Sequence, residues 1–400
     1  MDVEDKGEPS SIKEKDDEKG IKLCWHLVFT QFPPIKFTTM KISVYALIGF
    51  SSLLMSCMDN AKKADPTDSL IHELNKSRDS VDIEKVKQYI SEGADINHKD
   101  ARGRTPLFIA SLKWEAPVVK LLIEKGIDAK AKPDNNHTLL MLVIANGDKE
   151  IAQLVLDKGA NVNEKDSNGN VALCYSDGNV ELARLLIDKG ADVNAKSNDG
   201  TTPLMRASQN GYIALASLLI EKGAHVNDKD EMGFSALEFA ANPMTNGDAL
   251  TFLEDSAMTA LLLEKGANAN IRANDGTTPL MHAASFGYTK VAAQLIEKGA
   301  DVNAKDSLGQ TALMWIWLSD NGGKAEFAKL LLKKGANINE KSNEGRTALM
   351  GAAKLNNTED VALLIEKGAK VNSEDNAGKT ALAYTKDDSV IKLLQKHGAK

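Results

Sequence analysis

The sequence predicts an all-α repeat solenoid, in which antiparallel helix pairs stack on one another and are joined by β-hairpin fingers. Three observations predict this fold: a recurring Gly, a fixed spacing between these glycines, and a sequence motif that is repeated in each interval. Five of the nine intervals between the recurring glycines are 33 residues, and well-preserved intervals read GADVNAKDxxGxTPLMxAAxxGxxxVAxLLIEKG. Periods of about 20–50 residues indicate solenoids and related arrays. These glycines, mostly followed by Ala, are Gly93, Gly126, Gly159, Gly190, Gly223, Gly266, Gly299, Gly335, Gly368 and Gly398.

Each repeat begins with a helix whose limits are encoded locally. In Thr202–Leu204 (Thr-Pro-Leu), Thr is a good N-cap and Pro suits the first helical position. Small residues such as Ala283 and Ala284 follow one turn later and let a neighbouring helix approach closely. Gly211 is expected to end this helix. A second apolar run at 216–220 then leads into Glu-Lys-Gly, where Gly suits the position after a helix.

The segment that follows each helix pair has extended residues around a turn. Residues 226–233 show the pattern, and the repeated Asp residues there favour a hairpin turn. Each unit is therefore helix, turn, helix and hairpin. No such unit buries its apolar face alone, so stacking is obligatory.

With these motifs, residues 69–400 resemble the ankyrin-repeat family, with about ten repeats. Period, Thr-Pro-Leu, the Ala pair and Gly-Ala-Asp-Val-Asn agree in many copies. The His that the family usually carries after Thr-Pro-Leu is mostly Met here, as Met205, Met281, Met314 and Met350. Met, an adaptable side chain, is expected to fill the apolar gap.

Three repeats depart from the common length. The interval Gly223–Gly266 is 43 residues, and its additional residues lie in an insertion within 242–256. The interval before Gly335 is 36 residues and carries Trp315-Ile316-Trp317 where small residues are usual. The interval before Gly190 is 31 residues. The insertion and Trp317 are either features that bind a partner, or the result of variation in loop length together with an enlarged local core.

Composition excludes several classes of protein. Lys and Arg total 49 against 56 Asp and Glu, so the net charge is −7, and basic and acidic residues alternate along the chain. A nucleic-acid binder would carry a basic surface, and aromatic residues, at 5%, are too few to form a stacking platform for bases. The three cysteines, Cys24, Cys57 and Cys174, are scattered and include no Cys-x-x-Cys, so neither a disulfide framework nor a zinc cluster is predicted.

No catalytic motif stands out in the sequence. No two of the 29 glycines are two, four or five positions apart, which excludes the Gly-x-Gly-x-x-Gly, Gly-x-Ser-x-Gly and phosphate-loop motifs. No His pair has metal-ligand spacing. The sequence therefore predicts a protein that is not an enzyme, with no catalytic residue, no cofactor and no metal. The alternative is an enzyme whose site lies on the 242–256 insertion.

One apolar segment precedes the repeats. Residues 42–58 are 17 residues without a charge and follow Met40-Lys41. Their end, Leu54-Met55-Ser56-Cys57, resembles the lipobox of bacterial lipoproteins. That resemblance implies cleavage before Cys57 and lipidation of Cys57, and two or more acyl chains make anchoring stable. Met55 and the single Lys41 depart from the usual pattern.

The organisation expected from these features has four parts. Residues 1–39 are a gene-model extension or a disordered leader, 40–56 a lipoprotein-type signal segment, 57–68 a polar tether and 69–400 the repeat domain. Translation would then start at Met40. The alternatives are that 42–58 forms a signal anchor or a short membrane helix, or that it is a buried segment of a soluble protein.

The resemblance implies that finger tips and first helices form a concave groove that binds other proteins. The predicted function is a monomeric, non-catalytic scaffold for protein–protein interaction, displayed on a bacterial membrane outside the cytoplasm through Cys57. The alternatives are a cytoplasmic regulator or secreted effector with the same groove, or a passive envelope spacer. Aromatic side chains often dominate interface energies. The predicted protein-binding residues are Tyr212, Phe234, Phe286, Tyr288, Arg102, Arg104, Met232, Leu308, Trp317 and Arg346.

Overall fold

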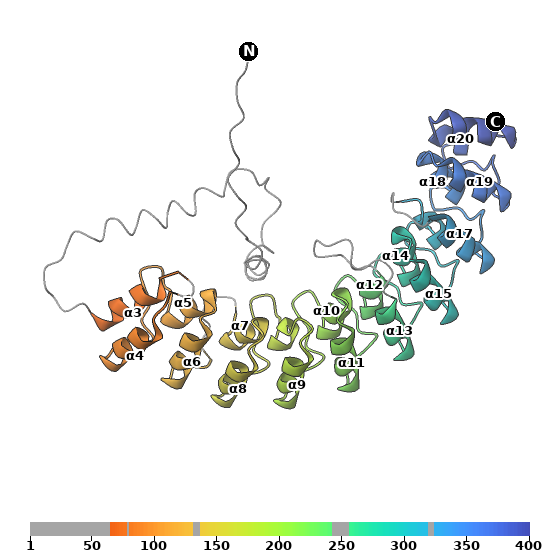
Figure 1. Cartoon of the computed structure of the whole chain (residues 1–400). Coiled ribbons are helices and arrows are strands. Elements are labelled where there is room, and N and C mark those ends of the chain that lie inside the picture. The colour runs from red at the N-terminus through yellow and green to blue at the C-terminus, as the bar shows by residue number, and fades with distance from the viewer. Residues whose placement is uncertain (1–64, 78–79, 131–136, 242–255, 319–323) are drawn as a thin grey trace, which may run out of the picture. The chain divides into compact units, whose positions relative to one another are not determined.

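Paired short helices make up the computed structural model, which describes residues 65–77, 80–130, 137–241, 256–318 and 324–400 (Figure 1). The chain forms two units, Met1–Val119 and Lys120–Lys400. The predicted signal segment, tether start and lipidation residue Cys57, and nearly all of the 242–256 insertion, lie outside the described residues. Within those residues no helix is long and apolar enough to cross a membrane.

The first unit contains α3 (Pro66–Leu74), α4 (Ile83–Ser91) and α5 (Pro106–Lys113), and the boundary with the second unit falls inside α6 (Ala116–Glu124). In the second unit the first helices of successive repeats are α7 (Leu139–Ala145), η1 (Ala172–Tyr175), α10 (Pro203–Gln209), α12 (Ala236–Ala241), α14 (Pro279–Phe286), α16 (Ala312–Trp315), α18 (Ala348–Lys354) and η2 (Ala381–Tyr384). The second helices are α8 (Lys149–Asp157), α9 (Val180–Asp188), α11 (Ile213–Glu221), α13 (Ala257–Glu264), α15 (Thr289–Glu297), α17 (Lys324–Lys333), α19 (Thr358–Glu366) and α20 (Asp388–Lys396).

In the second unit these helices form two layers. First helices pack on first helices, as α10 on α12 and α12 on α14, while second helices pack on second helices, as α13 on α15. The core lies between the layers, where Leu280 and Leu295 are almost completely buried. The described residues hold ten helix pairs, which agrees with the predicted count of about ten. The all-α stacked architecture is thus confirmed.

The helix limits follow the local signals. The hydroxyl of Thr278 accepts a hydrogen bond from the backbone N–H of Met281, and Gly287 ends α14 with a left-handed φ of 74°. In α10 the sulfur of Met205, which stands where His is usual, accepts a bond of 3.4 Å from the backbone N–H of Thr202. Met therefore completes the helix cap in addition to filling space.

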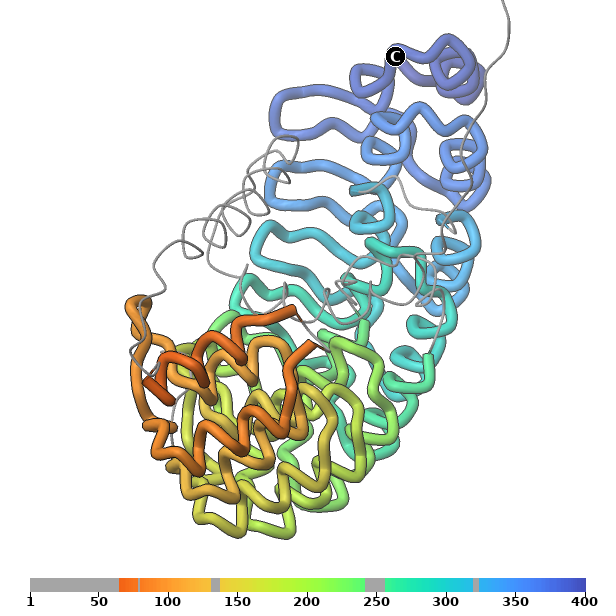
Figure 2. The backbone as a smooth tube through the Cα atoms, turned by 60° about the vertical axis from the view of Figure 1, so that its left-hand side comes forward, coloured from red at the N-terminus to blue at the C-terminus, as the bar shows by residue number. Residues whose placement is uncertain are grey.

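The predicted fingers are present as tight turns. In one of them the backbone N–H of Asp230 donates to the carbonyl of Phe234, and the Asp230 carboxylate accepts a bond of 2.7 Å from the Phe234 N–H. Among the described residues none of these turns extends into a β-ladder. Figure 2 shows the fingers of residues 300–400 projecting to one side of the helices.

Backbone bonds connect neighbouring fingers. The N–H of Asn274 donates to the carbonyl of Met232, and the N–H of Asn343 donates to the carbonyl of Leu308. The glycine in each finger permits this approach: a Cβ on Gly233 would lie 2.7 Å from the backbone nitrogen of Asn274. Each finger is thus held against the next.

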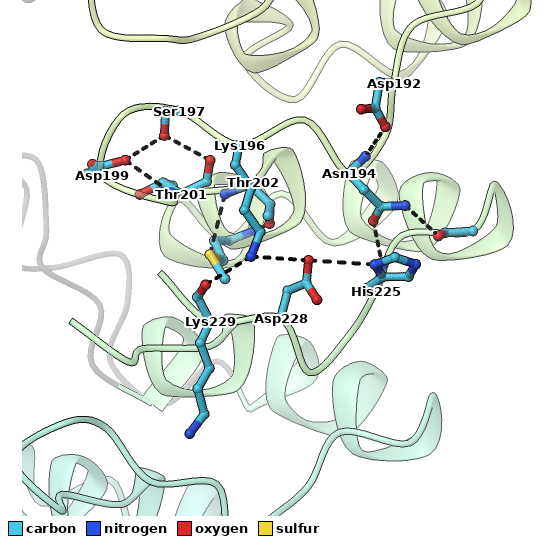
Figure 3. A network of polar contacts seen from close by, with 12 residues as sticks. Asp192, Asn194, Lys196, Ser197, Asp199, Thr201, Thr202, His225, Asp228 and Lys229 are labelled. Carbon is cyan, nitrogen blue, oxygen red and sulfur yellow. Dashed lines mark hydrogen bonds and ion pairs between the residues drawn. The ribbon is translucent and has the colours of Figure 1, made fainter. Parts of the chain in front are cut away.

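A single asparagine in each of seven repeats supplies the other connection. The amide of Asn270 donates to the carbonyl of Gly299 at 2.8 Å and accepts from the N–H of Asp301 at 2.7 Å. Figure 3 shows the same arrangement at Asn194, which receives the N–H of His225. The equivalent residues that make both bonds are Asn163, Asn194, Asn227, Asn270, Asn303, Asn339 and Asn372.

We expect Asn270→Ala to lower the free energy of unfolding by about 1–3 kcal/mol, since two hydrogen bonds to the next repeat are lost. Hydrogen exchange at the Asp301 amide should accelerate. Asn146→Ala is the matched control, because the Asn146 side chain bonds only Leu142 within its own repeat. Equal effects of the two variants on Asp301 exchange would contradict this role of Asn270.

Candidate functional site

Finger tips and the ends of first helices meet on one face of the second unit. The same hollow is lined by Leu308 and Arg346 of the fingers, by Trp317 just after α16 and by Lys354 at the end of α18. We call this surface the finger face. It combines tightly held backbone with side chains that differ between repeats, so it is where one array can acquire its own specificity.

Large exposed apolar side chains gather on the finger face. Met232 is 63% exposed at one finger tip, Leu308 is 60% exposed at another, and Leu318 is 58% exposed just after α16. In the first unit Leu112, near the end of α5, is 50% exposed. Leu318 was not predicted as a site residue, because the sequence alone does not show that α16 stops after one turn.

A row of side chains from consecutive first helices runs along the finger face, at the fourth position after the Thr or Ser that precedes each helix. Phe234, a predicted site residue, contacts two of them: its ring lies edge-to-face with Phe239 at 5.9 Å and with His282 at 5.5 Å. His282 in turn contacts Trp315 at 5.8 Å. Burial lowers the pKa of His282. The sequence prediction missed Phe239 and His282.

The finger aspartates anchor this row as well as shaping the turns. The indole N–H of Trp315 donates to Asp306 Oδ2 at 2.9 Å, while Asp306 Oδ1 accepts the backbone N–H groups of its own finger. The hydroxyl of Tyr384 donates to Asp375 in the same way at 2.5 Å. These carboxylates are thus engaged within their own repeats.

The other predicted aromatic residues do not join Phe234 in one cluster. Phe286 and Tyr288 stack on each other with ring centroids 5.5 Å apart, and both are half-buried. The Tyr212 hydroxyl donates to Asp177 of the preceding repeat, and its ring covers Gly178, where a Cβ would lie 2.9 Å away. Burial and the neighbouring carboxylate raise the pKa of Tyr212. Tyr212 therefore joins two repeats.

The predicted arginines fall in two places. Arg102 and Arg104 lie in a finger of the first unit, where Arg104 forms an ion pair of 2.7 Å with Asp100 and Arg102 is exposed. Arg346 lies in a finger of the second unit, 3.0 Å from Glu344 and over the Tyr384 ring at 5.9 Å.

The hollow on the finger face, which we call the Gly351 hollow, has a volume of about 260 Å³. Met314 and Trp317 of one repeat, Met350 and Gly351 of the next and Tyr384 of the third line it. Trp317, a predicted binding residue, is only 4% exposed and so contributes a wall. Leu308, Leu318, Arg346 and Lys354 line it as well.

Among the described residues, Glu238 is a buried carboxyl group with a raised pKa. Burial raises the pKa of Glu238 to about 7, and its Oε2 accepts the backbone N–H of Ser235 at 2.7 Å, which caps α12. Throughout the described ranges no three His, Cys, Asp or Glu side chains come together as a metal site. The position of Glu238 is thus explained by its structural role as a cap of α12.

Comparison with known proteins relates the chain to one family. The family profile described as ankyrin repeats (3 copies) matches residues 77–166, 171–257, 249–342 and 315–400. A solved structure, the human ASB11 ankyrin repeat domain, is similar with a TM-score of 0.50 and 24% identity, over 58% of this chain and 99% of that domain. This structural likeness shows the fold. No curated protein sequence matches the chain.

Glu238→Gln should stabilise the protein at alkaline pH. The raised pKa means that the folded state prefers the protonated acid, so this contribution is present below the ordinary pKa of 4.5 and is lost as pH rises through about 7. Gln keeps the acceptor for Ser235 without the buried charge. The gain in unfolding free energy should grow from near zero at pH 5 to about 1–3 kcal/mol at pH 8.5.

Thermal unfolding across that pH range measures the effect. Glu264→Gln, an exposed substitution at the end of α13, is the matched control and should show no pH-dependent gain. A gain of the same size at every pH would contradict the assignment to Glu238.

Proposed function

We propose that this chain, which belongs to the ankyrin-repeat family, is a non-catalytic scaffold that binds another protein through its finger face. Ankyrin repeats imply a protein–protein interaction scaffold. The observation that supports the finger face as the binding surface is the exposure of Met232, Leu308 and Leu318 there. No nucleic acid, cofactor or metal is part of this proposal.

Exposed apolar side chains indicate a binding surface only where several lie close together, because single ones are ordinary on protein surfaces. Leu308 and Leu318 line one hollow together, beside a guanidinium and an ammonium group. Full burial of one leucine side chain contributes about 1.5–3 kcal/mol. A partner that covers both, and contacts Met232 on an earlier finger, gains enough apolar burial for specific association.

Leu308→Asp should abolish capture of the partner by the full chain, because it places a charge at the centre of the apolar surface. Capture from the source cells, followed by mass spectrometry, measures this. Lys265→Ala, in the other helix layer, changes the net charge by the same amount and should capture what the wild type captures. If both variants and the wild type recover the same proteins, the finger face is not the binding surface.

We propose further that the scaffold is displayed on a bacterial membrane, outside the cytoplasm, through lipid on Cys57. The sequence pattern Leu54-Met55-Ser56-Cys57 after an apolar segment supports this. A lipid anchor would leave the repeat domain free to meet partners at the membrane surface. The competing proposal is a cytoplasmic or secreted ankyrin-repeat protein that uses the same face.

The intact mass of the native protein in a membrane fraction tests the anchor. We expect the mass of residues 57–400 plus lipid, and we expect Cys57→Ala to keep an unlipidated form. An unmodified mass for all 400 residues would overturn the lipidation proposal and favour the competing one.

A further inference from the structure

The row of side chains along the finger face is interrupted at one position. Arg206, Phe239, His282 and Trp315 occupy it in four consecutive repeats, and Tyr384 occupies it in the last repeat. In the repeat between Trp315 and Tyr384 the residue is Gly351, and the side chain of Trp317 from the preceding repeat packs against it. The Gly351 hollow lies beside this contact.

The backbone does not require glycine at this position. Gly351 lies inside helix α18 and does not have a positive φ. Glycine in a helix costs about 1 kcal/mol relative to alanine. A Cβ on Gly351 would lie 3.0 Å from Cβ of Trp317, so the glycine makes room for that tryptophan. Gly351 and Trp317 thus pack together as one part of the wall of the hollow.

The walls of the hollow suit an apolar side chain, and its volume of about 260 Å³ is enough to hold one. The walls include the thioether side chains of Met314 and Met350, which adapt to irregular apolar shapes. An inserted aliphatic or aromatic side chain would contact these walls.

The charges at the rim of the hollow indicate which charge the partner's segment carries next to its anchor residue. Arg346 and Lys354 both line the hollow, and Glu344 is the acidic residue of the lining. Glu344 is already paired with Arg346 at 3.0 Å. Lys354 is exposed, and among the described residues no carboxylate lies within ion-pair distance of it. In a chain of net charge −7, this rim carries one more positive than negative group.

We propose that the Gly351 hollow binds a segment of a partner protein that inserts one apolar side chain between Trp317 and Tyr384 and places a carboxylate at Lys354. The ligand class is therefore an acidic peptide segment with an apolar anchor residue. The exposed side chains of Leu308 and Leu318 cover the flanks of the anchor. This inference rests on the proposed scaffold function and names the chemistry of its partner.

A random dodecapeptide display library, selected on the full chain, tests the proposal. We expect the enriched sequences to share a Leu, Ile, Met or aromatic residue next to Asp or Glu. A fluorescent synthetic copy of the enriched peptide then gives dissociation constants by anisotropy. Lys354→Glu should weaken binding at least tenfold, and replacing the peptide's acidic residue by Lys should restore binding to that variant. Binding should also weaken as salt is added.

Two further variants separate the anchor from the charge. Gly351→Val pushes against Trp317 and so alters the wall of the hollow, which should weaken the peptide at least tenfold, with thermal unfolding confirming that the variant is folded. Leu318→Asp should weaken it similarly without altering the core. Lys333→Glu, an exposed charge reversal on the second-layer helix α17, is the matched control and should bind as the wild type does.

Several outcomes would overturn the hollow as the binding site. They are a basic or purely polar consensus, no consensus at all, or equal effects of Lys354→Glu and Lys333→Glu. A peptide that is lost with Met232→Asp but retained by Gly351→Val and Leu318→Asp would leave the finger face as a binding surface and reject the hollow. Capture of a partner by the wild type, and its loss in Met232→Asp, whose changed residue lies outside the hollow, decide the scaffold function independently.

Discussion

The stack of the second unit depends on one asparagine side chain at each of seven junctions between neighbouring repeats. At such a junction, the carbonyl of a glycine such as Gly299 and the N–H two residues later have no partner within their own helix. Asn270 of the preceding repeat satisfies both groups at once. An amide can donate and accept in this arrangement, whereas a carboxylate lacks the donor. Because the same pair of bonds recurs along the second unit, neighbouring repeats are fixed in register without an extended sheet.

The register fixed by these asparagines explains why differences between repeats collect on the finger face. Apolar contacts in the two helix layers and backbone bonds between fingers leave little freedom elsewhere. Side chains on the first helices can still vary, and where two neighbours vary together they change the surface. Trp317 and Gly351 are such a pair, since the large residue of one repeat is accommodated by the missing side chain of the next.

The sequence predicts the repeat units well, because their signals are local. Thr-Pro starts, Ala pairs and the glycine after each second helix act within a few residues of one another, and the structure has helices where these signals place them. The fingers were less predictable. Their Asp residues do shape turns, but the bonds that hold fingers together run between residues about 30–40 positions apart in the sequence, as from Asn274 to Met232.

The candidate site was predictable only in part, because it is a property of neighbouring repeats. Met232, Leu308 and Arg346 could be assigned to finger tips from their position in the repeat. The roles of Tyr212, bonded to Asp177, and of Trp317, packed on Gly351, depend on a second residue one repeat away. A comparison of the sequence repeat by repeat considers each position separately. It therefore misses a surface that two residues of neighbouring repeats form together.

Rigidity of the finger face bears directly on how a short segment could bind there. The finger of residues 306–310 is already held by the carboxylate of Asp306 and by the backbone bond from Asn343, so this part of the scaffold loses little conformational entropy on binding. The main entropic cost is then the ordering of the partner's segment and of the exposed Lys354 side chain. One buried anchor side chain and one charge-assisted contact at Lys354 together offset part of that cost, and the walls that receive the anchor are formed before the partner arrives. A preformed hollow with a charged rim therefore discriminates between partners by the sequence of the inserted segment more than by the size of the contact area.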